Sequence, residues 1–322
     1  MHEILLSNSV LVFLLSESIL FALLSIAFIL SAKILYHWDF ESFTPLQFRL
    51  EKQSYLVSSI ILLVFGIKFV LTLYFIYSLD ILSSIVTGAM CGAGVLDAND
   101  YGRPLLLLKL LILFLLTLWI SIHHYDMKSK TLAYFKDKSW LFLLIFLFLS
   151  IEIFLDFSYF SSIEPNIPVS CCSALFGQLE GANPLPFGLS LPLLLILFYL
   201  LFILMLLVQE EKYAKLNIII TLLFAFISYY SMVYFFGTYI YQIPTHKCPF
   251  CMLQKEYYFI GYLLWGSLLI ATYISLTQSI TSLYFNLSNP KRYTQIRLLL
   301  SFFVLLCTSY VVVYFYKNGV LL

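Results

Sequence analysis

Charged side chains are scarce in this sequence of 322 residues. Asp, Glu, Lys and Arg make up 11% of it, apolar residues make up 62%, and the formal net charge is only +1. The sequence contains no basic patch suited to nucleic acid and no glycine-rich loop of the kind that binds phosphate. These absences exclude nucleic acid as a partner and ATP-driven transport by this chain alone.

Three further patterns are missing: a signal peptide, a haem-attachment motif and a βαβ unit. The first residues hold no basic segment, and no small-residue cleavage site follows the first apolar run, so we expect a retained membrane span and not a signal peptide. The Cys-x-x-Cys at residues 248 to 251 is followed by Met252 and not by His, which argues against covalent haem attachment. No βαβ pattern surrounds this motif, so a thioredoxin-like domain is not expected either.

Long apolar runs are what the sequence does hold. Runs of about 18–25 residues have the length that crosses a membrane as helix. Since hydrocarbon satisfies no backbone hydrogen bond, such runs have to be helical. We therefore predict an all-α polytopic membrane bundle, one integral domain over residues 1–322, with about eight transmembrane helices. They are expected roughly at residues 9–32, 53–79, 104–122, 140–158, 189–208, 216–240, 256–276 and 297–316.

Lys and Arg are distributed unevenly over the connections between these runs. The first, third, fifth and seventh connections hold twelve, whereas the other connections and the termini hold four. By the positive-inside rule, the odd-numbered connections face the cytoplasm and both termini lie on the outer side. The expected location is the cell (inner) membrane, with membrane lipid around the bundle.

The cysteines follow this topology. Five of the six fall in the predicted outer loops 80–104, 159–188 and 241–255, and none falls in a cytoplasmic connection. These five are Cys91, Cys171, Cys172, Cys248 and Cys251. Disulfides persist on an oxidising outer face. The sixth, Cys307, lies near the middle of the last run, where we expect an inert, small apolar residue.

Cys248 and Cys251 form a Cys-x-x-Cys at the predicted entrance of a helix. Such a pair can close into a disulfide and reopen, and the positive end of the helix dipole stabilises the thiolate. His246 and Lys247, if they lie near, add positive charge with the same effect. A static disulfide and a half-site for a metal ion are the alternatives.

The run from Cys248 to Lys255 resembles the quinone-coupled disulfide-generating membrane proteins, the disulfide bond formation protein B and vitamin K epoxide reductase group. In the bacterial family an Arg near the bound quinone stands four residues after the second Cys. This sequence has Lys255 there, which could hydrogen-bond a quinone oxygen as a point charge. The resemblance covers eight residues of 322. It implies thiol oxidation with a quinone as cofactor; those families use a four-helix core.

A thiol oxidase of this kind needs a second cysteine pair that takes electrons from the substrate protein. Because a vicinal disulfide between Cys171 and Cys172 is strained, we expect one of them to bridge to Cys91 and the other thiol to attack. A structural staple between two loops with one spare thiol is an equal alternative.

Charged residues also lie inside the predicted spans, namely Glu17, Lys68, Lys109, Glu152 and Asp156. A helical rise of about 1.5 Å per residue puts all of them in the outer half of the membrane. Since unpaired charge is costly at that depth, we expect pairs such as Glu17 with Lys68. Two roles are open. Glu17, Lys68 and Glu152, with Lys255 and His246, could line a quinone site and carry protons, or the charges could only join helices.

The predicted function is a membrane thiol–disulfide oxidoreductase on the outer face, coupled to a membrane quinone, with a periplasmic thiol protein as substrate. One alternative is a soft Cu(I) or Zn site made by the outer cysteines and His246. Another is a non-catalytic subunit whose stapled loops dock a periplasmic partner such as a respiratory complex. Pro, Gly and charge in the outer half would also suit a transporter.

Overall fold

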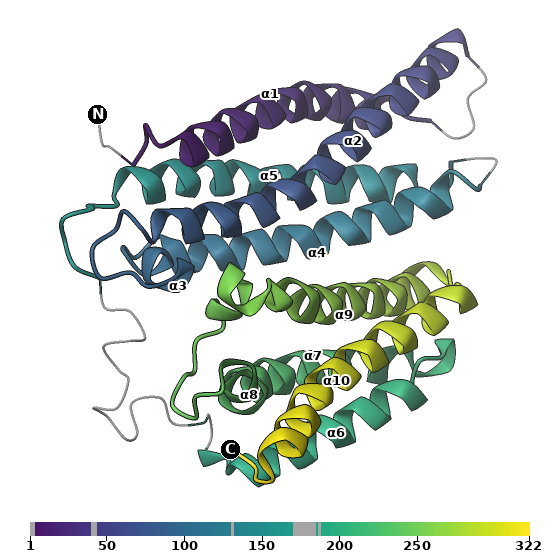
Figure 1. Ribbon diagram of the computed structural model, residues 1–322. Helices are drawn as coiled ribbons and strands as arrows, with labels where there is room; N and C mark the ends of the chain where they lie inside the picture. The colour runs from purple at the N-terminus through teal and green to yellow at the C-terminus, as the bar shows by residue number, and fades with distance from the viewer. Residues whose placement is uncertain (1–3, 40–43, 130–131, 170–184, 186–187) are drawn as a thin grey trace. The chain divides into compact units, whose positions relative to one another are not determined.

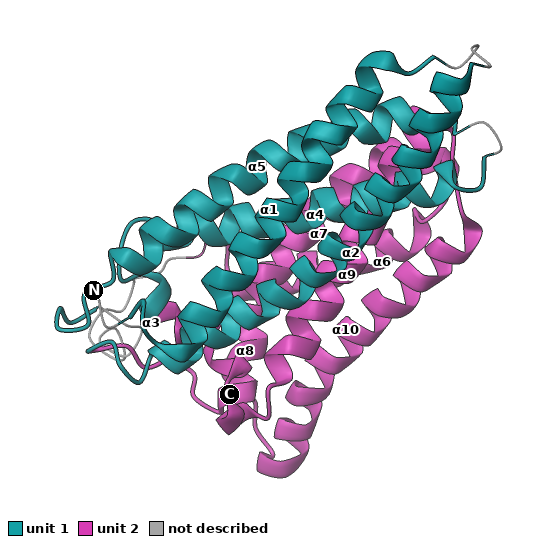
Figure 2. Cartoon of the chain, turned by 90° about the horizontal axis from the view of Figure 1, so that it is seen from above, with its two compact units in different colours: residues 1–87, 95–169 teal, residues 88–94, 170–322 magenta. Residues whose placement is uncertain are grey.

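The computed structural model describes the chain apart from residues 1–3, 40–43, 130–131, 170–184 and 186–187, and the regular elements of the described part are all helices (Figure 1). The chain divides into two compact units (Figure 2). Unit 1 comprises residues 1–87 and 95–169, and unit 2 comprises residues 88–94 and 170–322. The sequence carries no signal that predicts this division, and each unit is described by itself.

Unit 1 is built on four long helices: α1 (Asn8–His37), α2 (Pro45–Leu82), α4 (Gly102–Asp126) and α5 (Phe135–Ser161). Helix α1 packs against α2 and α5, and α4 packs against α5 (Figure 1). The short helix α3 (Gly92–Leu96) lies in the connection between α2 and α4. The four long helices surround a common core.

The buried residues of α1 lie on one face of the helix, which packs into this core. Its buried residues recur every three or four positions, including Val10, Phe13 and Glu17, which is the spacing of one helical face. The opposite face exposes large apolar side chains, with Leu15 56% and Ile19 62% exposed. A helix that is apolar all round suits lipid contact on its outer face.

The described part of unit 2 also holds four apolar helical segments. The first, third and fourth segments are α6 (Leu191–Leu207), α9 (Ile260–Phe285) and α10 (Pro290–Asn318). The second segment is continuous and consists of α7 (Ala214–Ser231), the π-helical turn η4 (Met232–Phe236) and α8 (Gly237–Tyr241). The 3-10 turn η3 (Glu211–Tyr213) precedes α7. Helix α7 packs against α6 and α9, and α9 packs against α10. The aromatic core includes Phe198, stacked on Phe224 with ring centroids 5.8 Å apart.

The all-α polytopic membrane fold is confirmed. Seven helices of the described part are long and apolar enough to cross a membrane, and α6, with 17 residues, is a shorter apolar helix. A helix of that length is about 26 Å long, slightly less than the hydrocarbon thickness of about 30 Å. The count of eight spans and the outer placement of the termini stay predictions.

The start of α4 offers a test of packing in unit 1. A Cβ added at Gly102 would lie 1.9 Å from the carbonyl oxygen of Leu96 and 2.9 Å from the ring of Tyr159. Gly102→Ala is expected to lower stability by roughly 1–3 kcal/mol, because backbone must move to make room. The thermal midpoint in lipid or detergent measures this. Gly66→Ala in α2 is the matched control, since no atom lies within 4 Å of its added Cβ. Equal losses in both variants would contradict this packing.

Candidate functional site

The segment between α8 and α9 carries the Cys-x-x-Cys in an irregular path. Helix α8 ends at Tyr241, and the next residue, Gln242, has a left-handed backbone with φ of 56°. Two 3-10 turns follow, η5 (Cys251–Leu253) and η6 (Lys255–Tyr257). The chain then enters α9 through Tyr258 and Phe259, with φ of 54° and 56°. Bulky residues seldom adopt this conformation, so packing around the segment must hold it in place.

The cysteines do not lie at the N-terminus of α9. This helix begins at Ile260, nine residues after Cys251, and Gln254 between them is extended. The predicted position of the two cysteines at the entrance of that helix is therefore wrong, and stabilisation of a thiolate there stays a prediction. A single 3-10 turn lacks the many aligned peptide dipoles that give a long helix its charged ends.

Three cysteine sulfurs meet in unit 2. The Sγ atoms of Cys91 and Cys248 are 3.5 Å apart, and those of Cys91, Cys248 and Cys251 all lie within 4.8 Å of one another. A disulfide has a sulfur–sulfur distance of about 2.05 Å, so Cys91 and Cys248 are thiols in contact. Exposure is 0% for Cys91, 1% for Cys248 and 7% for Cys251. We call these three residues the cysteine cluster.

Side chains of α8 and α9 hold the turn that carries Cys248. The hydroxyl of Tyr241 donates to the carbonyl oxygen of Cys248 and accepts a hydrogen bond from the backbone N–H of Met252. The indole N–H of Trp265 donates to the carbonyl oxygen of Pro249 at 3.1 Å. These bonds satisfy polar backbone groups around the cysteines and fix the conformation of the turn.

Gln254 ties the segment that carries Cys91 to the same turn. Its side-chain amide donates to the carbonyl oxygen of Met90 at 3.2 Å. Cys91 and Cys248 are 157 residues apart in the sequence. A sequence pattern cannot reveal a contact between residues so far apart. From the sequence we expect Cys91 to pair with Cys171 or Cys172, and its contact with Cys248 is not predicted.

His246 is the buried base of this segment. Its ring lies against that of Tyr241, with centroids 4.1 Å apart. Burial lowers the pKa of His246 below its usual value of 6.5, and the Cys91 thiolate opposes that shift. This direction favours the neutral imidazole, and a positive charge from His246 beside the thiolates stays a prediction.

The two lysines of the segment are exposed. The ammonium of Lys247 lies 4.8 Å from the ring centre of Tyr234, in a cation–π contact. Lys255 lies on η6, four residues after Cys251. Its contact with a quinone stays a prediction.

The three cysteines outside the cysteine cluster are Cys171, Cys172 and Cys307. Cys171 and Cys172 lie outside the described residues, and the predicted bridge from one of them to Cys91 stays a prediction. Cys307 is 1% exposed in α10 and donates to the sulfur of Met232 at 3.4 Å. That contact fits the expected small, buried residue.

A chain of buried ion pairs in unit 1 joins the five charged residues that the sequence places inside the spans, and we call it the charge chain. Lys68 Nζ donates to both carboxylate oxygens of Glu17, at 2.9 and 2.8 Å, and to Glu152 Oε2 at 2.8 Å. Lys109 Nζ donates to Glu152 Oε1 at 2.7 Å and to Asp156 Oδ2 at 3.0 Å. The predicted pair of Glu17 with Lys68 is confirmed, and Glu152 links it to Lys109 and Asp156.

The residues predicted to bind a cofactor belong to both units. Glu17, Lys68 and Glu152 lie in the charge chain of unit 1, where they bond one another. His246 and Lys255 lie in unit 2. A quinone site that contains all five stays a prediction.

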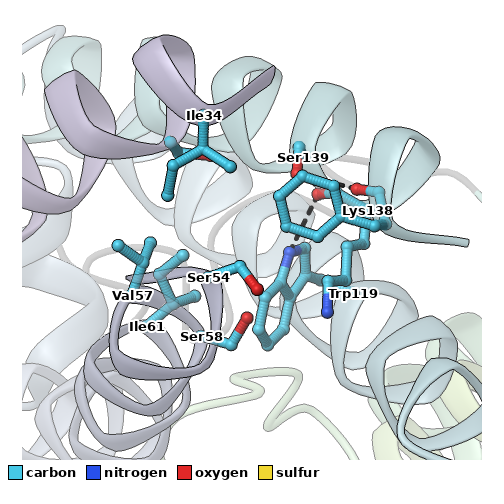
Figure 3. Close-up of a pocket in the computed structure, with 10 residues that line it drawn as sticks. Ile34, Ser54, Val57, Ser58, Ile61, Trp119, Lys138 and Ser139 are labelled. Atoms are coloured by element: carbon cyan, nitrogen blue, oxygen red, sulfur yellow. Dashed lines mark hydrogen bonds between the residues drawn. The ribbon is translucent and has the colours of Figure 1, made fainter. Parts of the chain in front are cut away.

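A small cavity in unit 1 is lined by apolar side chains, such as Ile34, Val57 and Ile61, together with several serines (Figure 3). The indole N–H of Trp119 donates to the backbone carbonyl of Lys138 at 2.9 Å beside it. The volume of about 10 Å³ is roughly that needed for one water molecule, so a quinone cannot fit. The hydroxyls that line the cavity are those of Ser31, Ser54, Ser58 and Ser139.

Comparison of the chain with protein-family models, with curated proteins and with solved structures finds no match. The chemistry of the cysteine cluster and of the charge chain is therefore the basis for assigning a function.

Mild oxidation is expected to join Cys248 to either Cys91 or Cys251, because all three sulfurs lie within 4.8 Å of one another. Mass-spectrometric mapping of the linked peptides identifies the bond. In Cys251→Ser the Cys91–Cys248 link should predominate, and in the control Cys307→Ser the pattern should match that of the wild type. Recovery of Cys91 only in a bridge to Cys171 or Cys172 would contradict the contact.

Gly261 on α9 tests how the cluster is supported. A Cβ added there would lie 2.6 Å from Met252 Cγ and 2.9 Å from Leu253 Cδ2, so it would displace η5. Gly261→Ala is expected to cost about 1 kcal/mol of stability and to speed alkylation of Cys251. Gly266→Ala on the same helix meets nothing within 4 Å and is the control. Unchanged alkylation in Gly261→Ala would show that η5 does not depend on this contact.

Proposed function

We propose that the protein is a membrane thiol–disulfide oxidoreductase and that the cysteine cluster is its catalytic group. The observation that carries the proposal is the contact of Cys91 with Cys248 at 3.5 Å, with Cys251 within 4.8 Å of both. Disulfide exchange needs a thiolate close to a disulfide sulfur, and here each sulfur has two others within that reach. A static staple needs only two cysteines.

The three sulfurs of the cluster are sufficient for one step of disulfide exchange, with no other reactant. Starting from a Cys248–Cys251 disulfide, the thiolate of Cys91 attacks Cys248 Sγ. The Cys91–Cys248 bond forms, the Cys248–Cys251 bond breaks, and Cys251 leaves as a thiolate. No net electrons move in this step, because one disulfide replaces another. Neutral His246 is the base available in the same segment when a thiol ionises.

The net reaction oxidises two thiols of a substrate protein to a disulfide. Two electrons and two protons pass to a membrane quinone, which becomes a quinol. The motif from Cys248 to Lys255 supports a quinone as the oxidant. The four apolar helical segments of unit 2 equal in number the four-helix core of the families that the motif resembles. Cys171 and Cys172 are the proposed entry for substrate electrons.

A second function is favoured by the same distances. Three thiolates bound to a tetrahedral zinc ion at about 2.3 Å lie about 3.8 Å from one another. The contact of 3.5 Å between Cys91 and Cys248 is close to that spacing. His246 is a fourth donor type in the same segment, and thiolates also suit Cu(I). The alternative is therefore a site that binds a soft metal ion.

Cys248→Ser and Cys251→Ser are each expected to reduce quinone-dependent thiol oxidation to background, because each removes a sulfur that must form the disulfide. The assay uses purified protein in lipid, a reduced substrate protein and a soluble quinone, and follows quinone absorbance. Cys307→Ser, which changes a buried thiol in α10, should retain the wild-type rate. A wild-type rate in either of the first two variants would rule out the proposal.

Two measurements separate the alternatives. One equivalent of copper or zinc retained by protein purified under reducing conditions, and lost in Cys91→Ser, would favour the metal site. Differential thiol alkylation in cells, with the quinone pool oxidised or reduced, follows the state of the cluster. Cysteines that stay oxidised in both conditions would indicate a structural role.

A further inference from the structure

The charge chain of unit 1 is not balanced. It contains three carboxyl groups, those of Glu17, Glu152 and Asp156, against the ammonium groups of Lys68 and Lys109. With all five ionised, three negative charges and two positive charges give a formal charge of −1. The side chains are only 0–7% exposed. Uncompensated charge at such a place in a membrane bundle is very unfavourable, so one more positive charge is needed.

Hydrogen bonds identify the least satisfied carboxyl group. Glu152 accepts from both ammonium groups, and Glu17 accepts from Lys68 with both of its oxygens. Asp156 accepts from Lys109 with Oδ2 alone. Its Oδ1 lies 3.0 Å from Lys109 Nζ but accepts no hydrogen bond among the described residues. Asp156 is also completely buried.

Aromatic rings surround the same end of the charge chain. The ammonium of Lys109 lies 4.9 Å from the ring centre of Phe13 and 4.8 Å from that of Phe75. Both rings contact Phe160, with centroids 5.9 and 6.1 Å apart. These rings leave little room for a hydrated ion. A metal cation would also lie beside two ammonium groups that repel it, whereas a proton on a carboxyl oxygen needs no further space.

We propose that Asp156 holds a proton at neutral pH and that unit 1 is thereby a one-proton site inside the membrane bundle. The charge chain is neutral with this proton bound and carries −1 when it leaves. The charged groups that face one another come from all four long helices of the unit: Glu17, Lys68, Lys109, Glu152 and Asp156.

Acids buried in membrane helices in this way are typical of proton relays. Reversible binding of one proton is therefore the activity that we assign to this chain of residues. The assignment does not depend on the cysteine cluster, which belongs to unit 2.

Infrared spectroscopy of the full chain in lipid at neutral pH tests the proposal. The wild type should show the C=O stretch of a protonated carboxyl group, shifted in D₂O and moved by ¹³C labelling of aspartate side chains. Asp156→Asn should lose this band. Glu17→Gln should lose it as well, because two carboxylates and two ammonium groups then balance without the proton. Asp97→Asn, which changes an exposed pair with Arg103, is the control that should keep it.

Thermal stability gives an independent readout. Asp156→Asn replaces a neutral group with a neutral amide and should keep a midpoint near that of the wild type. Lys109→Met, which removes a positive charge, should lower the midpoint clearly. Absence of the band in the wild type, its persistence in either carboxyl variant, or its appearance only in sodium-free buffer would overturn the proposal. Equal thermal losses in Asp156→Asn and Lys109→Met would do the same.

Discussion

In the hydrocarbon interior of a membrane no water is present to bond a polar group, so partners have to come from the protein itself. This constraint makes the long apolar runs helical, and it acts equally on their polar side chains. In unit 1 it joins four helices through the charge chain. In unit 2 it joins α7, α9 and the residue Gln209 just after α6: Asn217 donates to Ser275 and Ser279 at 3.1 and 2.8 Å, and Gln209 donates to Asn217 at 2.8 Å. Polar contacts of this kind specify which helices pack together.

The cysteine cluster is held in place by side-chain hydrogen bonds to an irregular turn and not by packing of long helices. Its turn is not a continuation of a helix, and the left-handed residues Tyr258 and Phe259 separate it from α9. Hydrogen bonds from Tyr241 and Trp265 keep the turn in place, and Gln254 adds the segment that carries Cys91. The sulfurs are thus brought together by side chains from several parts of unit 2. Their burial limits reaction with oxidants in the solvent.

The proposed thiol exchange and the proposed proton binding belong to different units, yet the two reactions are chemically related. Oxidation of two thiols to a disulfide releases two protons together with two electrons, and a membrane quinone takes up both kinds of particle when it is reduced. A protein that catalyses this reaction has a use for a buried acid such as Asp156. The charge chain is better suited to that role than to direct contact with a quinone, because its ammonium groups are already bonded to carboxyl groups.

The sequence by itself determined the membrane class, the approximate places of the helices and the pairing of Glu17 with Lys68. Run length and the cost of buried charge are local properties that need no knowledge of the fold. Only the tertiary structure decided that Cys91 meets Cys248, that Glu152 links the two lysines, and that Cys251 opens a 3-10 turn nine residues before α9. These features depend on contacts between residues far apart in the chain, such as that of Gln254 with Met90, and on loop conformation, which hydropathy does not encode.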